Sequence, residues 1–300
     1  MHSLTLAPLG EHRCELGESP LWHPEEQALY AVDIARRQIL RWAGGEGEPE
    51  VWPQEAEPSC LALRAGGGLL VARRDGLFAF GPASGQTERL QPPPYDATRQ
   101  RYNDGKVDAA GRFWVGTIDD ARAPNAALYR LDPSGARSMA EGITTSNGLA
   151  WSPDGRWMYW ADTKAHTIFR LPFNGASGEI GECEPWARFA PRTAGQALDN
   201  YGGRPDGAAV DAEGAYWVAM FEGQRLLRLN PQGDILQTLV LPVRCPTMPC
   251  FGGADLRTLF ITTAREKRPA DELAAQPWAG AVLSLRVPVP GLPPNRALYG

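Results

Sequence analysis

The chain repeats one pattern six times, and this repetition constrains the fold more than any other feature of the sequence. Each unit holds an apolar-x-apolar stretch, a turn of Pro, Asp and Gly, an apolar strand, a second turn and a third strand. The units span residues 20–42, 60–80, 106–131, 149–173, 208–230 and 250–287. A period of about 40 to 45 residues is typical of four-stranded propeller blades. We therefore predict an all-β fold, a six-bladed β-propeller.

A polar residue recurs at the same position just before four of the units. These residues are Glu18, Asn103, Asn147 and Asp206. In each case an apolar residue follows at the fourth position and a turn comes near the eighth. The same register puts Ser59 at this position in the second unit, and Thr247 or Met248 in the sixth. Because equivalent positions in structural repeats occupy equivalent places in space, the four polar side chains should converge at one mouth of the channel.

The composition is compatible with one closed domain over residues 1–300. The 33 Gly and 27 Pro supply many turns, and an apolar fraction of 43% can fill a sizeable core. The longest spacing between successive recurring polar residues runs from Asn147 to Asp206. It requires an irregular loop, which we place at residues 185–204. A seven-bladed propeller and a pair of β-sandwiches are the architectural alternatives, and a count of six units disfavours both.

Charge and hydropathy disfavour several classes of partner. The net charge is -5 and no run of Lys or Arg is present, so we expect no nucleic-acid partner. No apolar stretch is long enough to span a membrane. The first 18 residues lack the pattern of a secretory signal. Five cysteines without a C-x-x-C pair indicate reduced thiols in a cytoplasmic protein. A disulfide between Cys245 and Cys250 is the one alternative. The sequence does not indicate an oligomeric state.

The converging polar residues predict a site for a hard cation. Glu18, Asn147 and Asp206 supply two carboxylates and one amide oxygen. An all-oxygen set suits Ca²⁺, Mg²⁺ or Mn²⁺ better than a structural Zn²⁺, and the four histidines show no ligand spacing. Asn-Gly and Asp-Gly are common turn dipeptides, so each residue alone would indicate a turn. Their shared register favours the cation site.

Five segments of the chain resemble the gluconolactonase/regucalcin family, also called the senescence marker protein family. They read GESPLW (17–22), RYNDGKVDAAGRFWVGT (101–117), SNGLAWSPDGRWMYWAD (146–162), RPDGAAVDAEGAYWVA (204–219) and CFGGADLRTLFITTA (250–264). They stand in the family's order, and the resemblance covers residues 14–285. It implies a six-bladed propeller that binds one divalent cation and hydrolyses aldonolactones.

The resemblance also implies roles for individual residues. Glu18, Asn147 and Asp206 match the family's metal ligands, with Ca²⁺ as the first expectation and Zn²⁺, Mn²⁺, Mg²⁺ or Fe²⁺ as alternatives. Arg101 and Asn103 match residues that hydrogen-bond the sugar lactone.

The chain departs from the family pattern after its third unit. In the animal regucalcins an acid stands where this chain has Ala121. Asp119 or Asp120 could reach the substrate in its place, so the substrate preference is left open. Asp104 is expected to bond backbone N–H groups of a turn.

The function implied by these residues is metal-dependent hydrolysis of a sugar lactone to its aldonic acid. The cation would act as a Lewis acid on the lactone carbonyl. Asp206 would take a proton from the attacking water, although a cation beside it makes it a weak base. No G-x-S-x-G elbow supports a serine hydrolase, and no Gly-rich loop supports phosphate binding.

Two alternatives remain open. One is a promiscuous hydrolase of phosphotriesters or other esters that uses the same cation. The other is a non-enzymatic calcium-binding or protein-binding propeller, which Arg101 and Asn103 disfavour because a calcium buffer does not need them. The sequence does not determine which lactone is the substrate.

Overall fold

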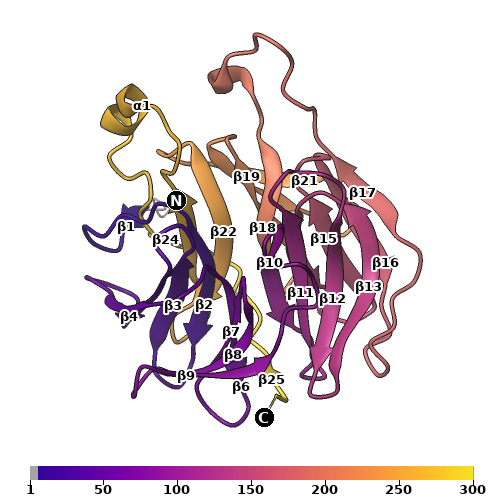
Figure 1. The fold of residues 1–300 in the computed structure, drawn as a ribbon. Coiled ribbons are helices and arrows are strands. Elements are labelled where there is room, and N and C mark those ends of the chain that lie inside the picture. Colours follow the sequence, from indigo (N-terminus) through magenta and orange to yellow (C-terminus); the bar gives the residue numbers. More distant parts are fainter. Residues whose placement is uncertain (1–5, 300) are drawn as a thin grey trace.

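Six four-stranded units radiate from a central channel in the computed structural model, which describes residues 6–299 (Figure 1). From the inner to the outer strand, blade 1 contains β2 (Gly17–His23), β3 (Ala28–Asp33), β4 (Gln38–Ala43) and β5 (Glu50–Pro53). Blade 2 contains β6 (Pro58–Arg64), β7 (Leu69–Arg73), β8 (Gly76–Gly81) and β9 (Gln86–Gln91). Blade 3 contains β10 (Gln100–Val107), β11 (Phe113–Asp119), β12 (Ala126–Asp132) and β13 (Gly135–Ile143).

The remaining blades follow the same order. Blade 4 contains β14 (Ser146–Trp151), β15 (Trp157–Asp162), β16 (Thr167–Pro172) and β17 (Glu184–Arg188). Blade 5 contains β18 (Arg204–Val210), β19 (Tyr216–Phe221), β20 (Arg225–Leu229) and β21 (Ile235–Val240). Blade 6 contains β22 (Cys245–Gly252), β23 (Thr258–Ala264), β24 (Leu283–Arg286) and β1 (Ala7–Pro8). The prediction of a six-bladed β-propeller is confirmed.

Segments near both ends of the chain tie the ring together. Strand β1 pairs with β24, so blade 6 combines strands that lie far apart in the sequence. A short strand near the other end, β25 (Arg296–Ala297), pairs in parallel with β6 of blade 2. Inner strands contact one another around the ring, and β2 contacts both β6 and β22. Closure of this kind leaves only short sheet edges.

Every inner strand has a register shift at the position of the recurring polar residue. The shifts fall between Glu18 and Leu21, Pro58 and Cys60, Tyr102 and Gly105, Asn147 and Ala150, Pro205 and Ala208, and Pro246 and Met248. In the sixth unit the shift encloses Thr247, whose Oγ1 donates to the carbonyl oxygen of Gly17 at 2.6 Å. A bulge re-aims the side chain beside it. The six shifts therefore mark structurally equivalent positions.

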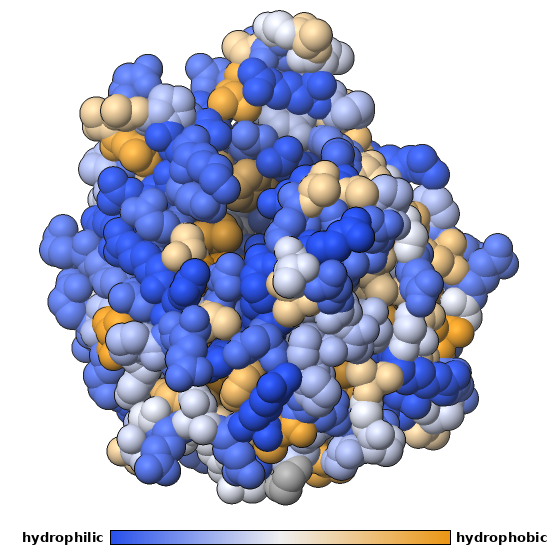
Figure 2. Space-filling model, in the orientation of Figure 1, coloured by the Kyte–Doolittle hydropathy of each residue, from blue (hydrophilic) through white to orange (hydrophobic). Residues whose placement is uncertain are grey.

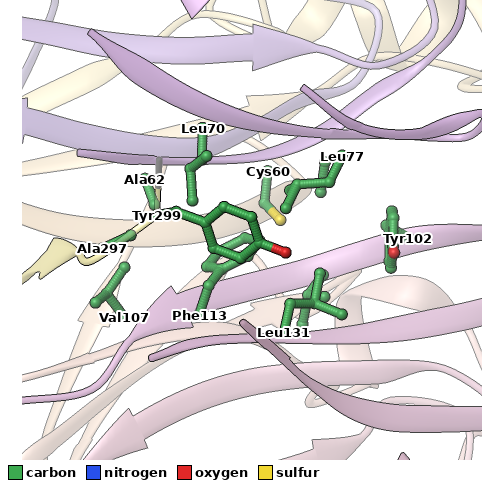
Figure 3. Close-up of a cluster of buried hydrophobic side chains, with 12 residues drawn as sticks. Cys60, Ala62, Leu70, Leu77, Tyr102, Val107, Phe113, Leu131, Ala297 and Tyr299 are labelled. Carbon is green, nitrogen blue, oxygen red and sulfur yellow. The ribbon is translucent and has the colours of Figure 1, made fainter. Parts of the chain in front are cut away.

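The hydrophobic core is divided among the gaps between neighbouring blades. Figure 3 shows one part, in which Cys60 and Leu70 of blade 2 face Phe113 and Leu131 of blade 3. Tyr299 closes this part, and its hydroxyl donates to the carbonyl oxygen of Asp132 at 2.6 Å. Each blade thus buries its apolar faces against both neighbours, which fixes the inner strands around the channel.

A buried aspartate orders the first turn of blade 3. Asp108 is fully buried and accepts hydrogen bonds from the backbone of Ala110 and Arg112. It also accepts from Trp114 Nε1 at 2.9 Å and Arg112 Nε at 2.6 Å. Asp211 makes the corresponding contacts in blade 5 with Trp217 and Arg228. This arrangement explains the recurrent turn near the eighth position.

Replacing Asp108 with alanine should destabilise the protein by about 3–5 kcal/mol, because the buried Trp114 and the part-buried Arg112 lose their shared acceptor. Asp154 supplies a matched control, since it lies in the equivalent turn of blade 4 but is exposed and pairs with Arg156 at the surface. Asp154→Ala should cost under about 1 kcal/mol. Urea unfolding of both variants measures the difference, and equal losses of stability would contradict this role of Asp108.

The connections differ in part from the expectation. Residues 185–188 of the predicted irregular loop belong to β17, and the remainder includes a short 3-10 helix, η1 (Leu198–Asn200). The loop between β23 and β24 carries α1 (Ala270–Ala275). This loop and the loop between β17 and β18 extend from the same end of the ring (Figure 1). All five cysteines are free. Within residues 6–299, neither helical segment has the length and apolarity of a membrane span.

Candidate active site

One hydrogen-bonded chain of polar side chains runs across the channel mouth from blade 3 to blade 5. Arg101 Nη1 donates to Asn103 Oδ1 at 2.7 Å, and Asn103 Nδ2 donates to Asn147 Oδ1 at 2.8 Å. Asn147 Nδ2 donates in turn to Asp206 Oδ1 at 2.6 Å. All four side chains are buried. The structure therefore brings together four of the residues that the sequence indicated.

The backbone at two of the bulges has an unusual conformation. Gly148, which follows Asn147, has φ 64°, and Ser19, which follows Glu18, has φ 48°. This left-handed region suits glycine but is uncommon for serine. The Ser19 hydroxyl accepts a hydrogen bond from the backbone N–H of Leu61 at 2.9 Å, which anchors this turn to blade 2. Strain of this kind persists where the surroundings hold the backbone in place.

Glu18 and Asp206 form a pair of like charges at the mouth. Burial among protein atoms raises the pKa of Glu18 well above its usual value, and the charges of Asp206 and Asp104 raise it further. Burial also raises the pKa of Asp206, to about 8, while Arg204 opposes this shift and Asp104 adds to it. Two acids that destabilise each other's charge in this way favour a proton or a cation between them.

The donor chemistry at the mouth fits a hard divalent cation. Glu18 and Asp206 offer carboxylate oxygens, and the Asn147 Oδ1 atom accepts one hydrogen bond, from Asn103, which leaves it a second lone pair. Oxygen donors of this kind suit Ca²⁺, Mg²⁺ or Mn²⁺. Within residues 6–299, no three His, Cys, Asp or Glu side chains are grouped as a metal site. The candidate set is therefore two carboxylates and one amide.

Two groups of opposite charge, Asp104 and Lys106, lie farther along the inner strand β10. Asp104 Oδ2 accepts from the backbone N–H of Leu149 at 2.9 Å, and its Oδ1 is buried without a partner in the described part of the chain. Lys106 Nζ donates to the carbonyl oxygens of Leu149 and Ala208. Burial raises the pKa of Asp104, and the charge of Lys106 opposes that shift. Asp104 thus bonds a backbone N–H, as predicted, but one in the neighbouring blade.

The two acids expected near the substrate form no hydrogen bond with this cluster within residues 6–299. Asp119 is 1% exposed, and its carboxylate accepts hydrogen bonds from the backbone of Ala121 and Ala123 and from Asn125 Nδ2. Both oxygens order their own loop, so a substrate contact would require that loop to open. Asp120 is partly exposed and pairs with Arg74 at 2.9 Å. Its contact with substrate stays a prediction.

The structure adds residues to the mouth that the register did not indicate. Thr163 Oγ1 accepts from Asn147 Nδ2 at 2.8 Å and so helps to orient that amide. His166 Nε2 and the Tyr201 hydroxyl are 2.5 Å apart, which ties the turn after β15 to the long loop after β17. No sequence signal marks these residues, because they lie in turns outside the repeated strand pattern.

A cavity of about 450 Å³ lies at the opposite end of the channel. Its walls come from the later residues of the inner strands, such as Trp22, Val107 and Val210, and from the segment Leu292 to Asn295. This cavity is mainly apolar, whereas the mouth formed by the strand beginnings carries the polar chain. The surface drawn in Figure 2 is largely hydrophilic around a central hollow, and its apolar residues show as small, separate spots.

Comparison with known proteins identifies the family. Residues 16–265 match the family described as SMP-30/Gluconolactonase/LRE-like region. The chain belongs to this family. It is 43% identical over 278 residues to 6-deoxy-6-sulfogluconolactonase from Pseudomonas putida, covering 92% of each chain. It is 31% identical over 303 residues to regucalcin from Gallus gallus, covering 98% of each.

Solved structures agree with this membership. A calcium-binding protein, regucalcin, from Agrobacterium tumefaciens matches with a TM-score of 0.89 and 27% sequence identity, covering 99% of this chain and 98% of that chain. The family resemblance drawn from the five segments is therefore confirmed.

Proposed function

We propose that the protein hydrolyses a sugar lactone to its aldonic acid with one divalent cation held by Glu18, Asn147 and Asp206. One observation carries the proposal: a continuous hydrogen-bonded chain links Arg101, a candidate substrate residue, to two of the three candidate ligands. The lactonase name of the relative from P. putida and the calcium-binding description of the A. tumefaciens protein support it. We take Ca²⁺ as the first candidate, with Zn²⁺, Mn²⁺, Mg²⁺ and Fe²⁺ as alternatives.

Each residue has a distinct task in this proposal. A cation bound here would supply a Lewis acid for the lactone carbonyl. Asp206, once deprotonated, accepts a proton from the attacking water. Arg101 uses only Nη1 for its bonds to Tyr102 and Asn103 within residues 6–299. Its other guanidinium nitrogens can donate to the substrate. Asn103 holds Arg101 and Asn147 in place and keeps one lone pair of Oδ1 for a substrate hydroxyl.

The alternatives use the same residues differently. A phosphotriester or other ester hydrolase would need the same cation, and only the rim of the mouth would differ. A non-enzymatic calcium-binding protein would not need a buried guanidinium beside the ligands. Assays of acid release from a panel of aldonolactones, both neutral and sulfonated, and of a phosphotriester, on protein of known metal content test the proposal. Turnover of the phosphotriester alone would contradict it.

Calcium should bind more tightly as the pH rises from about 5 to about 8. Burial raises the pKa of Glu18 and of Asp206, the latter to about 8, so the ion-free acids hold protons in this range. A cation binds the deprotonated carboxylates, so its affinity should rise about tenfold per pH unit for each proton released. Calorimetry in two buffers of different ionisation enthalpy counts these protons. Binding without proton release and without pH dependence would contradict the assignment.

A further inference from the structure

We propose that the mouth of the channel recognises an anionic group on the lactone, held by Arg122 and Lys164 and supported by Arg101. This inference rests on the proposed lactonase function and narrows its substrate class. The substrate would be an aldonolactone that carries a sulfonate or phosphate group away from its reacting carbonyl.

The contacts place Arg122 and Lys164 at the rim above the candidate ligands. Thr163 bonds the Asn147 amide directly, and Lys164 is the next residue in that turn. Lys164 Nζ donates to the carbonyl oxygen of Arg122 at 3.0 Å, which joins a loop of blade 3 to a turn of blade 4. The Lys164 ammonium and the backbone of Arg122 therefore lie in the wall beside Asn147.

Nearby carboxylates do not neutralise these cations. Within residues 6–299, none of Arg101, Arg122 and Lys164 forms an ion pair with a carboxylate, although Arg101 is only 9% exposed. The acids around them are engaged elsewhere. Asp119 accepts backbone N–H groups of its own turn, and Asp162 accepts those of Thr144, Thr145 and Lys164. Asp120 pairs with Arg74. Arg122 and Lys164 are exposed, and the Arg101 guanidinium keeps donors besides Nη1, so all three can contact a ligand without breaking an ion pair.

Arg101 and Arg122 are close enough to act on each other. After burial, the charge of Arg122 is the largest influence that lowers the pKa of the Arg101 guanidinium. The charges of Glu18 and Glu57 oppose this shift, and a further anion beside the two guanidinium groups would oppose it more strongly. A bound anionic group would therefore stabilise both side chains.

The charge balance of the loaded site leads to the same conclusion. A divalent cation would balance Glu18 and Asp206, and Lys106 lies near enough to Asp104 to oppose its charge. The three cations Arg101, Arg122 and Lys164 then outnumber the two nearby carboxylates that form no ion pair within the described residues, Asp119 and Asp162, so the mouth keeps a positive balance. Positive potential in a partly enclosed cleft attracts anions and raises their local concentration.

The loop of blade 3 carries an alanine, Ala121, directly before Arg122, so the neighbouring side chain adds no opposing charge. Arg122 itself has φ 57°, an uncommon backbone conformation for a residue with a side chain. The turn bonds of Asp119 and the bond from Lys164 hold this conformation. The loop therefore presents a cation whose preceding residue carries no charge.

Steady-state kinetics on three lactones test the proposal with calcium-loaded protein. The substrates are glucono-1,5-lactone and its 6-deoxy-6-sulfonate and 6-phosphate counterparts. We expect kcat/KM at least tenfold higher for one or both anionic lactones. Arg122→Gln should lower kcat/KM on the anionic lactones about ten- to a hundredfold, mainly through KM, since a charged hydrogen bond is lost. Its effect on the neutral lactone should be much smaller.

Two variants control for folding and charge. Arg122→Lys should recover part of the loss because it keeps the charge. Arg156→Gln removes an exposed arginine of blade 4, in the turn between β14 and β15, and should change none of the three rates. The anionic lactone that is preferred identifies sulfonate or phosphate as the group recognised.

Two results would overturn the inference in distinguishable ways. If the neutral lactone is hydrolysed as well as the anionic ones, and Arg122→Gln affects all three equally, the anion site is wrong while the lactonase function stands. If no lactone is hydrolysed by the calcium-loaded protein, the proposed function fails and the inference fails with it.

Discussion

An Asp206→Asn variant is expected to retain measurable calcium binding yet hydrolyse lactone about 10²–10⁴-fold more slowly than the wild type, the usual scale for loss of a general base. The substitution keeps an oxygen donor of the same size at the channel mouth. It removes the proton acceptor, and the hydrogen bond from Asn147 can be kept by the amide oxygen. Calorimetric calcium titration and lactone hydrolysis on the same sample separate the two roles of Asp206.

Glu18→Gln is the matched control for this variant. Glu18 is proposed as a ligand alone, so excess calcium should restore most of the turnover of Glu18→Gln and little of that of Asp206→Asn. If saturating calcium restores full turnover to Asp206→Asn, then Asp206 is only a ligand. The base would then be Asp104 or solvent, or Asp119 if its loop opened.

Arg101→Leu should lower kcat/KM for lactone about ten- to a hundredfold, which corresponds to the loss of one charged hydrogen bond. Calcium affinity should change little, because a guanidinium cannot ligate a cation. Arg101→Lys serves as the control for charge. It keeps the positive charge but loses the planar fork that also holds Asn103, so its activity should stay well below that of the wild type. Unchanged kinetics in a folded, calcium-loaded Arg101→Leu protein would exclude the assignment.

The inner strands were predictable because each combines a polar residue, an apolar alternation and a turn at fixed offsets. The Asp108 and Asp211 carboxylates show why the turn recurs, since each collects the N–H groups of its turn and a tryptophan Nε1. Such local bonds leave a clear pattern in the sequence. The bulge that follows Glu18 or Asn147 is equally local, and it explains why sequence register placed these side chains at one mouth.

The outer strands and the closure of the ring were not predictable in the same way. Strands β9 and β21 are mostly exposed, so neither face requires apolar residues and no alternation appears. The pairing of β1 with β24 and of β25 with β6 joins two-residue strands to partners far away in the sequence. Pairings this short and this distant leave no periodic signal.

The candidate ligands were predictable, but the wall around them was not. In the pairing of β14 with β15, Asn147 lies opposite Ala161. The turn that carries Thr163 and Lys164 begins just after Ala161, so this pairing brings both residues to the mouth. Asp119 shows the opposite case. Its position after Thr117 suggested a substrate contact, but the three groups that it bonds lie within six residues of it. A turn acid and a substrate acid look alike until those bonds are seen.

The most direct test of the account is lactone hydrolysis by one preparation before and after removal of its metal. We predict that chelation abolishes acid release from aldonolactones and that one equivalent of a divalent cation per chain, calcium first, restores it. The same titration on an Asn147→Leu protein should show weakened binding and a matching loss of turnover. Full lactone hydrolysis by metal-free protein, verified by elemental analysis, would contradict the proposed mechanism.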